Sequence, residues 1–322
     1  MRVCVTGGAG YVGAVAVDEL LGAGHDVTVL DSLAHGQRPV AEALAARGVR
    51  VVTGDVRDAG ARQAALGGAE AVVHLAAIVG DPACAHEPAL SQAVNVDAAR
   101  ALVSDIAGLP VRRLVFASTC SNYGRTADPA VPVDETAPLR PVSLYAEQKV
   151  TVERELLDRR DGALTVTCLR LATVYGVGPR MRFDLTVNEF TRDLWAGQRL
   201  DVYGERFWRP YVHVRDAARA IRRVLDAAPD HVAGRVYNVG RSDENYRKLD
   251  LVEVITGRLG RGEVRYVHRD EDPRDYRVSF ERIRGHLGFV PDMCLPDGVE
   301  ELVAALERRR FGDPFSARYA NA

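Results

Sequence analysis

Two residues that could exchange a proton, Tyr145 and Lys149, stand four positions apart in the segment S-L-Y-A-E-Q-K-V. The sequence contains 42 lysines and arginines together, yet Lys149 and Lys248 are its only lysines. Side chains at positions i and i+4 share one face of a helix. The Lys149 ammonium could therefore favour the ionised phenol and also bind a ribose. The broad guanidinium of arginine would not fit this double role, and we interpret the pair as an acid–base unit.

A glycine-rich segment, V-C-V-T-G-G-A-G-Y-V-G (3–13), places Gly8, Gly10 and Gly13 in the spacing G-x-G-x-x-G, with Gly7 before them. The segment lies between an expected strand and an expected helix. Glycines at such a junction permit a tight turn and let backbone N–H groups approach a pyrophosphate at the helix N-terminus. The spacing therefore predicts a dinucleotide site.

Polar or small residues end the next three apolar runs. Asp31 ends V-T-V-L-D, where a carboxylate would accept the ribose hydroxyls of NAD and repel the 2′-phosphate of NADP. Asp55 could accept a hydrogen bond from the adenine amino group, with Val56 packing beside it. The small residues of H-L-A-A (74–77) would let the cofactor lie against the backbone. The carboxylate of Asp31 therefore favours NAD over NADP as the cofactor.

Short β-branched runs alternate with longer alanine-rich segments of helical periodicity up to about residue 175. This alternation predicts parallel strands joined by right-handed crossovers, that is, an α/β fold with a doubly wound parallel sheet. The expected strands are 2–6, 26–30, 49–53, 71–75, 111–117 and 164–170. The expected helices are 11–23, 39–46, 58–66, 90–107 and 143–160.

The alternation of strands and helices ends at about residue 175, and the sequence after it contains loops rich in arginine, proline and aromatic residues. Helices are expected near 184–196, 214–227, 246–258 and 297–309, and a strand at 235–239. We expect an NAD-binding Rossmann domain over 1–175 with a return segment of about 209–240. A smaller mixed substrate domain would then comprise 176–208 and 241–322.

The formal net charge of -2 argues against a nucleic-acid-binding protein, which usually carries a basic excess. The five cysteines are widely spaced and include no C-x-x-C pair, so they indicate neither a disulfide framework nor a metal site. No signal peptide and no apolar run long enough to span a membrane is evident. These features predict a cytoplasmic protein.

The glycine segment, the aspartate after the second strand, the threonine of T-C-S-N-Y-G (119–124) and Y-x-x-x-K together resemble the extended short-chain dehydrogenase/reductase family. The resemblance is to its NAD-dependent nucleotide-sugar epimerases and dehydratases, and it extends over nearly the whole chain. It implies that Tyr145 takes the proton of a sugar hydroxyl, normally at C4, while NAD takes the hydride. Thr119 would hydrogen-bond the same oxygen. The cofactor contacts that it implies are Gly7, Gly10, Tyr11, Val12, Gly13, Asp31, Asp55, Val56, Leu75, Ala76, Ala77, Asn95 and Lys149.

The resemblance also implies contacts to a nucleotide-diphosphate sugar. R-P-Y-V-H-V (209–214) is similar to a family segment whose arginine holds the diphosphate, which here is Arg209. The remaining expected substrate contacts are Thr173, which stands where the family often has asparagine, and Arg180, Arg182, Arg269 and Arg274.

The fate of the resulting 4-keto sugar depends on residues 120 and 121. Dehydratases of the family carry an aspartate and a glutamate there, whereas this sequence has Cys120 and Ser121, either of which could act as an acid or base. We therefore expect a 4-epimerase that returns the hydride. A dehydrogenase, ketoreductase or dehydratase stays open, as does a non-catalytic NAD-binding sensor, which the presence of Thr119, Tyr145 and Lys149 disfavours.

Apolar stripes at helical spacing mark the segments 90–107 and 143–160. In the family that the sequence resembles, two such helices pair with their copies to form a four-helix bundle. We therefore expect a homodimer with an isologous interface.

Overall fold

The structure, a computed structural model, describes residues 1–159, 162, 164–268 and 274–321. Its main sheet has seven parallel strands in the order β10-β6-β5-β4-β1-β2-β3. In chain order they are β1 (Arg2–Thr6), β2 (Asp26–Asp31), β3 (Arg50–Thr53), β4 (Ala71–His74), β5 (Arg113–Thr119), β6 (Thr165–Leu171) and β10 (Arg235–Val239). The prediction of a doubly wound parallel sheet is confirmed.

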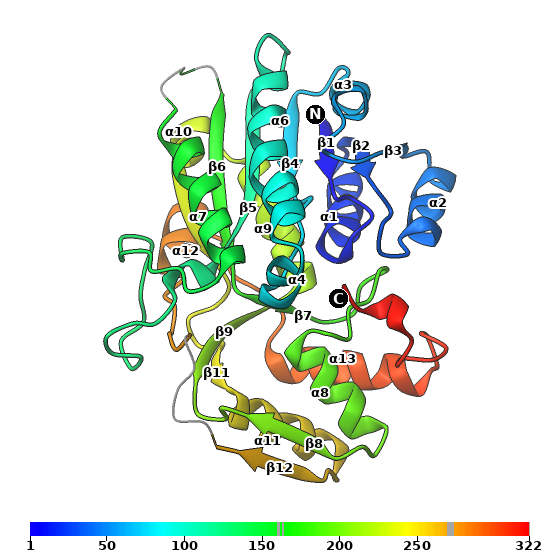
Figure 1. The fold of residues 1–322 in the computed structure, drawn as a ribbon, viewed down its shortest axis with the longest axis vertical. Coiled ribbons are helices and arrows are strands. Elements are labelled where there is room, and N and C mark those ends of the chain that lie inside the picture. Colours follow the sequence, from blue (N-terminus) through cyan, green and yellow to red (C-terminus); the bar gives the residue numbers. More distant parts are fainter. Residues whose placement is uncertain (160–161, 163, 269–273, 322) are drawn as a thin grey trace.

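Helices cover both faces of this sheet (Figure 1). One face packs against α1 (Tyr11–Gly22), α2 (Arg38–Ala46) and α9 (Val214–Asp226), and the other against α3 (Ala59–Leu66), α6 (Ala98–Ile106) and α7 (Leu144–Leu157). Successive side chains of a strand point to opposite faces. In β1, Val3 and Val5 accordingly join the first core and Cys4 joins the second.

The strand order reverses between β1 and β4. The chain adds β2 and β3 on one side of β1, and then adds β4, β5, β6 and β10 on the opposite side of β1. In open α/β sheets a ligand binds beyond the carboxyl ends of the strands at such a switch point. The glycine segment, Asp31 and the end of β4 all lie at this edge, so the topology brings the predicted cofactor residues together.

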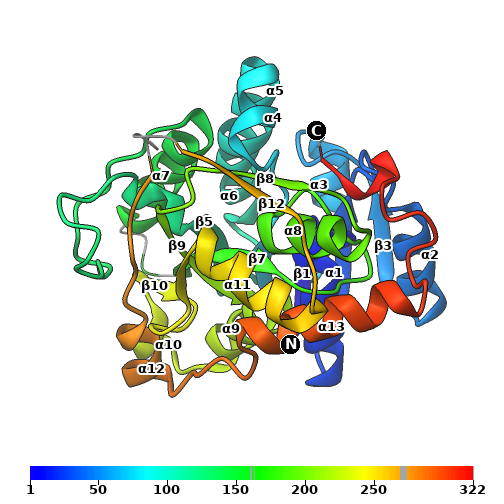
Figure 2. The ribbon, with the colours of Figure 1, turned by 90° about the horizontal axis from the view of Figure 1, so that it is seen from below.

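A smaller unit lies beneath that edge in Figure 1, and it is nearest the viewer in Figure 2, which is seen from below. It contains a sheet of β7 (Thr173–Tyr175), β9 (Trp208–His213) and β11 (Asn245–Arg247), and a parallel pair of β8 (Leu200–Tyr203) and β12 (Val264–Val267). Its core joins α8 (Thr186–Trp195), α11 (Lys248–Leu259) and α13 (Leu295–Glu307). Short helices complete the chain: α4 (Asp81–His86), α5 (Pro88–Gln92), α10 (Pro229–Val232) and α12 (Glu281–Leu287).

Two expected helices differ from the structure. The segment 90–107 runs from α5 through a π-helical stretch (Ala93–Asp97) into α6, and 246–258 begins as β11 before α11 starts at Lys248. The strands β7, β8, β9, β11 and β12 were not predicted; they lie in the part of the chain where strands and helices no longer alternate regularly.

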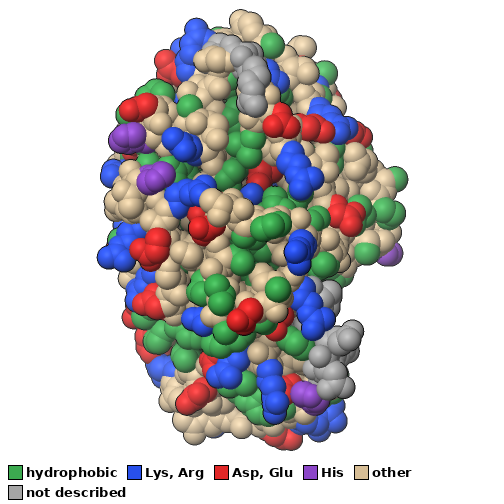
Figure 3. Space-filling model, turned by 90° about the vertical axis from the view of Figure 1, so that its left-hand side faces the viewer, with side chains coloured by type: hydrophobic (Ala, Val, Ile, Leu, Met, Phe, Trp, Pro, Cys, Tyr) green, Lys and Arg blue, Asp and Glu red, His purple; other side chains and the backbone are tan. Residues whose placement is uncertain are grey.

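No helix in the described part of the chain has the length and apolar character needed to cross a membrane. On the face shown in Figure 3, basic and acidic side chains are interspersed.

Candidate active site

The glycine segment forms a cradle that side chains would fill. Gly7 has φ +72°, and a Cβ there would lie 2.8 Å from the backbone nitrogen of Ala76. A Cβ on Gly13 would lie 2.0 Å from the carbonyl oxygen of Gly7. Only glycine fits these two positions, so the turn keeps its backbone N–H groups open at the start of α1. This cradle suits the pyrophosphate of a dinucleotide.

Asp31 stands at the end of β2 beside this cradle. Its carboxylate accepts hydrogen bonds from the backbone N–H groups of Ala9 (3.0 Å) and Leu33 (2.9 Å). Burial raises the pKa of this carboxyl despite both bonds. Each carboxylate oxygen keeps further acceptor capacity, so Asp31 could still accept hydrogen bonds from the ribose hydroxyls of NAD.

The other residues predicted to contact the cofactor differ in their burial and in their hydrogen-bond partners. Leu75, Ala76 and Ala77 are half-buried at the end of β4. Asp55 forms an ion pair with Arg57, whose guanidinium donates to both carboxylate oxygens (3.0 and 2.8 Å).

Three further residues that were predicted to contact the cofactor have side chains that make contacts within the protein. Val56 is buried in the core, and Val12 is half-buried between two cores. Asn95 donates to the carbonyl of Ile78 (3.0 Å) and accepts from its N–H (2.8 Å).

Tyr11 joins the glycine cradle to the smaller unit. Its hydroxyl donates to the carbonyl oxygen of Gly176 (2.6 Å) and accepts from the side-chain amide of Asn188 (3.2 Å). Asn188 in turn accepts from the N–H of Gly176 (2.9 Å) and donates to the carbonyl of Arg182 (2.8 Å). The segment after β7 is therefore fixed against the start of α1.

The predicted acid–base pair lies on the first two turns of α7, which begins after Ser143 caps it through the N–H of Ala146 (3.3 Å). Lys149 is buried, and its Nζ donates to the carbonyl oxygen of Ala117 in β5 (2.8 Å). The same Nζ lies 4.8 Å from the ring centre of Phe116 and 5.9 Å from that of Tyr145. The helical spacing therefore places the ammonium beside the phenol.

Burial dominates the protonation of both groups. It lowers the pKa of Lys149 to about 8 and raises the pKa of Tyr145. Burial and the nearby Lys149 together lower the pKa of His74 to about 3, so this histidine is neutral. In the protein alone the proton therefore stays on the phenol, and a further positive charge is needed to favour the phenolate.

Thr119, Cys120 and Ser121 follow the carboxyl end of β5. Thr119 is almost buried, and its hydroxyl accepts from the N–H of Ser121 (3.1 Å). The thiol of Cys120 is buried in the core, where it donates to the carbonyl of Arg170 (3.2 Å), and burial raises its pKa. Ser121 is half-buried and shares a hydrogen bond with the Tyr276 hydroxyl. This geometry favours Ser121 over Cys120 at a bound sugar.

Two of the predicted substrate arginines lie near one another. The guanidinium of Arg209 lies 5.6 Å from the ring centre of Tyr276 and donates to the carbonyl of Trp208 (2.6 Å). Burial raises the pKa of Tyr276, and the charges of Arg209 and Arg274 oppose this rise, so both arginines lie near Tyr276. Arg269 is outside the described residues, and Thr173 is half-buried in β7.

Burial and the nearby charge of Arg182 lower the pKa of Arg180, so the two arginines lie near one another. Arg182 pairs with Asp184 (2.6 Å). Arg180 instead donates to the carbonyls of His35 (3.3 Å) and Ala320 (3.0 Å) and interacts with the charge of Asp31.

Arg180 therefore lies near Asp31. Its Nε is buried and has no hydrogen-bond partner among the described residues.

A buried ion pair below these residues was not anticipated. The Arg170 guanidinium donates to the Glu153 carboxylate (2.5 Å), which also accepts from the Ser118 hydroxyl (2.5 Å). Arg170 further donates to the hydroxyl of Tyr123 (2.8 Å). Two signals could have indicated the pair: Glu153 follows Lys149 by one more helical turn, and Arg170 interrupts an apolar strand.

Known proteins are similar to this chain in sequence and in fold. The profile of the NAD dependent epimerase/dehydratase family matches residues 3–240. The chain is 31% identical over 313 residues to a UDP-glucose 4-epimerase of Corynebacterium glutamicum, with 91% of each chain covered. It is 33% identical over 322 residues to a dTDP-glucose 4,6-dehydratase of Streptomyces griseus, covering 96% of this chain and 95% of the relative.

Solved structures agree with these matches. A Thermus thermophilus UDP-glucose 4-epimerase in complex with NAD superposes with a TM-score of 0.84 at 29% identity, covering 95% of this chain and 99% of that one. A dTDP-glucose 4,6-dehydratase of Streptomyces venezuelae with NAD bound gives 0.86 at 29% identity, covering 98% and 100%. The chain belongs to the NAD dependent epimerase/dehydratase family and is an NAD-dependent enzyme of the extended short-chain dehydrogenase/reductase type.

Proposed function

We propose that the protein is a nucleotide-sugar epimerase that inverts C4 through a transient 4-keto sugar. The observation that carries this proposal is the site at the end of β5, where the helix of Tyr145 and Lys149 packs against β5 and the turn after it, and positions 120 and 121 carry no carboxylate. UDP-glucose 4-epimerases and dTDP-glucose 4,6-dehydratases are both among the relatives. The family's elimination of water uses carboxylates at these two positions, so their absence favours the epimerase.

In this proposal Tyr145 removes the proton from the C4 hydroxyl and later returns it. NAD, when bound, accepts and returns the C4 hydride and adds positive charge near the phenol. Lys149, whose Nζ donates to the Ala117 carbonyl, would also hold the nicotinamide ribose, and its charge would favour the phenolate. Thr119 positions the C4 oxygen. Cys120 takes no part, because its thiol is buried and bonded to the Arg170 carbonyl.

The proposed cofactor contacts follow the edge of the sheet. The glycine cradle would hold the pyrophosphate and Asp31 the adenosine ribose, so NAD is expected to bind more tightly than NADP. We assign Arg180 to this side, since its guanidinium bridges His35 and Ala320 beside Asp31. The carboxylate of Asp55 could still accept from the adenine amino group, although Arg57 already occupies it.

The proposed substrate is a nucleotide-diphosphate sugar, which would lie between the end of the main sheet and the smaller unit. Arg209 and Arg274 would face its diphosphate, and Arg182 and Thr173 its sugar side. This assignment keeps the division between a cofactor domain (1–175 and about 209–240) and a substrate domain (176–208 and 241–322). The separate core of the smaller unit supports the division.

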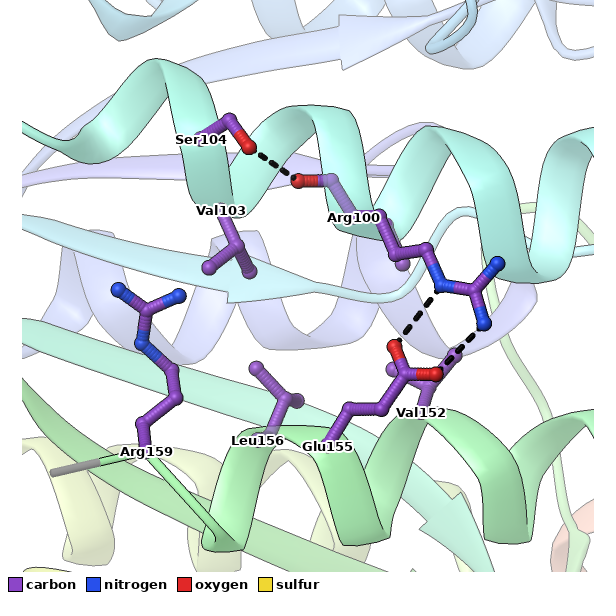
Figure 4. A pocket seen from close by; sticks show the side chains of 8 residues that line it. Arg100, Val103, Ser104, Val152, Glu155, Leu156 and Arg159 are labelled. Carbon is purple, nitrogen blue, oxygen red and sulfur yellow. Dashed lines mark hydrogen bonds and ion pairs between the residues drawn. The ribbon is translucent and has the colours of Figure 1, made fainter.

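The proposed assembly is a homodimer through α6 and α7. A shallow groove between these helices is lined by Ala99, Arg100, Val103, Ser104, Val152, Glu155, Leu156 and Arg159. Figure 4 shows the apolar side chains of both helices in the groove and Arg100 paired with Glu155 across it. An apolar floor with charged rims suits an interface between two copies of the same surface.

The test is product analysis of the NAD-loaded enzyme with UDP- and dTDP-hexoses by proton NMR. The proposal predicts the C4 epimer without net formation of NADH, and no epimer with Tyr145→Phe. Accumulation of NADH would indicate a dehydrogenase, and a 4-keto-6-deoxy sugar would indicate a dehydratase. NAD binding without turnover of any nucleotide sugar would indicate a sensor.

A further inference from the structure

An ion pair connects the two sides of the proposed substrate site. Nη1 of Arg274 lies 2.8 Å from Oδ2 of Asp81, although 193 positions separate the two residues in the sequence. Asp81 is the first residue of α4, which packs against α7, the helix of Tyr145 and Lys149. In Figure 1, α4 lies at the lower edge of the main sheet, above β7.

Arg274 belongs to the opposite side. It precedes Asp275, whose carboxylate accepts from the N–H of Trp208 (2.9 Å), and Tyr276, which contacts Ser121 and Arg209. The Arg274 guanidinium is therefore close to the cations that would meet a diphosphate. In the protein alone a carboxylate already pairs with it.

We propose that Asp81 competes with the substrate's diphosphate for Arg274, so that this ion pair must open before a nucleotide sugar binds. The inference rests on the proposed function, which places a diphosphate beside Arg209 and Arg274. The side chains of Arg274 and Asp81 are 35% and 28% exposed, so the pair is accessible to an entering anion. A phosphate oxygen offers the same acceptor geometry to a guanidinium as a carboxylate does.

The same carboxylate also acts on the acid–base pair. Burial raises the pKa of Tyr145. Cys84 and Asp81 from α4 raise it further, Arg182 from the segment before α8 lowers it, and Lys149 lies on the same helix as Tyr145. Removing the charge of Asp81 should therefore lower the pKa of Tyr145 as well as remove one anionic partner of Arg274. A purely structural role of Asp81 would produce neither change.

The experiment measures binding of UDP and of dTDP to the NAD-loaded protein by calorimetry, for the wild type and Asp81→Asn. We expect the variant to bind about two- to fivefold more tightly, which is the range that an accessible ion pair contributes. Glu87→Gln is the matched control, because it removes an exposed carboxylate from the same segment. It should leave the affinity unchanged.

Arg274→Gln completes a double-mutant cycle. It should weaken binding of both nucleotides, and adding Asp81→Asn to it should then change nothing. Unchanged or weaker binding by Asp81→Asn alone, or an equal gain in the Arg274→Gln background, would overturn the proposal. Where an activity is measurable, the pH profile of Asp81→Asn should also shift towards lower pH.

These binding assays do not depend on which reaction the enzyme catalyses. If the predicted changes in affinity occur and no epimer forms, the proposed reaction fails and the competition stands. If the epimer forms and Asp81→Asn does not tighten binding, only the competition fails.

Discussion

The two sides of α7 carry similar ion pairs in opposite environments. On the inner side Glu153 pairs with Arg170, and the two side chains are 1% and 5% exposed. On the outer side Glu155 pairs with Arg100 in the groove of Figure 4, and these side chains are 43% and 50% exposed. Both pairs are bidentate, so the chemistry of the contact is the same.

The difference shows what burial does to a charge. A buried pair cannot lose one partner without leaving an uncompensated charge in a medium of low polarity, whereas water replaces a partner at the surface. The inner pair lies one helical turn beyond Lys149 and bonds Ser118, the neighbour of Thr119. We infer that the inner side of α7 is fixed because the acid–base residues need fixed positions, and that the outer side is available to a second copy.

The largest expected effect is on the inner side, at Tyr145. Tyr145→Phe removes one hydroxyl, so folding and NAD binding should stay nearly intact while turnover falls by about 10²–10⁴-fold, as expected for loss of a general base. Lys149→Arg should also be damaging, because the buried ammonium between Ala117 and Phe116 leaves no place for a planar guanidinium. Thr119→Ala should cost less, and Thr119→Ser almost nothing. Turnover of Lys149→Arg at the wild-type rate would refute this role for the lysine.

Glu153→Ala should have the next largest effect, on stability. It leaves the Arg170 guanidinium buried without its carboxylate, which typically costs about 3–5 kcal/mol. Chemical denaturation, monitored by circular dichroism, gives the free energy of unfolding. The matched outer variant Glu155→Ala should change this quantity by less than about 1 kcal/mol. Equal losses in the two variants would remove the distinction between the sides.

Burial of Lys149 should make stability depend on pH. Its pKa is about 8 in the folded protein and about 10.4 when unfolded, so the unfolded chain binds more protons between these values. Stability from this group therefore rises with pH across that window, by at most about 1.4 kcal/mol per pH unit. Lys149→Met should lose this rise between pH 8 and 9, and Lys248→Met should keep it. Parallel stability curves for the wild type and Lys149→Met would contradict the expected shift.

The smallest effect is expected at the outer pair. Arg100→Ala should change the stability of a single chain by only about 0.2–1 kcal/mol. Val103→Asp, in the same groove, should convert the proposed dimer to a monomer, because it places a charge in the apolar floor. Chemical denaturation measures the change in stability, and light scattering at micromolar concentration measures the oligomeric state. A wild-type monomer would refute the dimer.

How much of this site the sequence predicts depends on how local each feature is. The glycine cradle, Asp31 and the Tyr145–Lys149 pair are local patterns at the ends of strands or on one helix, so spacing alone places them. Arg180 is different, because its contacts to His35 and Ala320 span more than 100 positions. The sequence predicted a substrate contact for Arg180, whereas its partners in the fold support our proposal that it serves the cofactor side.

The buried contacts illustrate the same limit. The Glu153–Arg170 pair forms only after β6 lies beside β5, and Asp81 meets Arg274 only after the smaller unit folds against the sheet. A sequence shows the charges but not the partners. The short strands β7, β8, β9, β11 and β12 were missed for a related reason, since pairing between distant segments defines them.

The central claim is that the C4 hydride leaves the sugar and returns to its other face within one site. The most direct measurement uses UDP- and dTDP-hexoses carrying deuterium at C4, with the NAD-loaded enzyme and product analysis by NMR and mass spectrometry. The account predicts a C4 epimer that retains the deuterium at C4, and no conversion with Tyr145→Phe. Loss of the deuterium to solvent, or its transfer to C6 of a 4-keto-6-deoxy sugar, would contradict it.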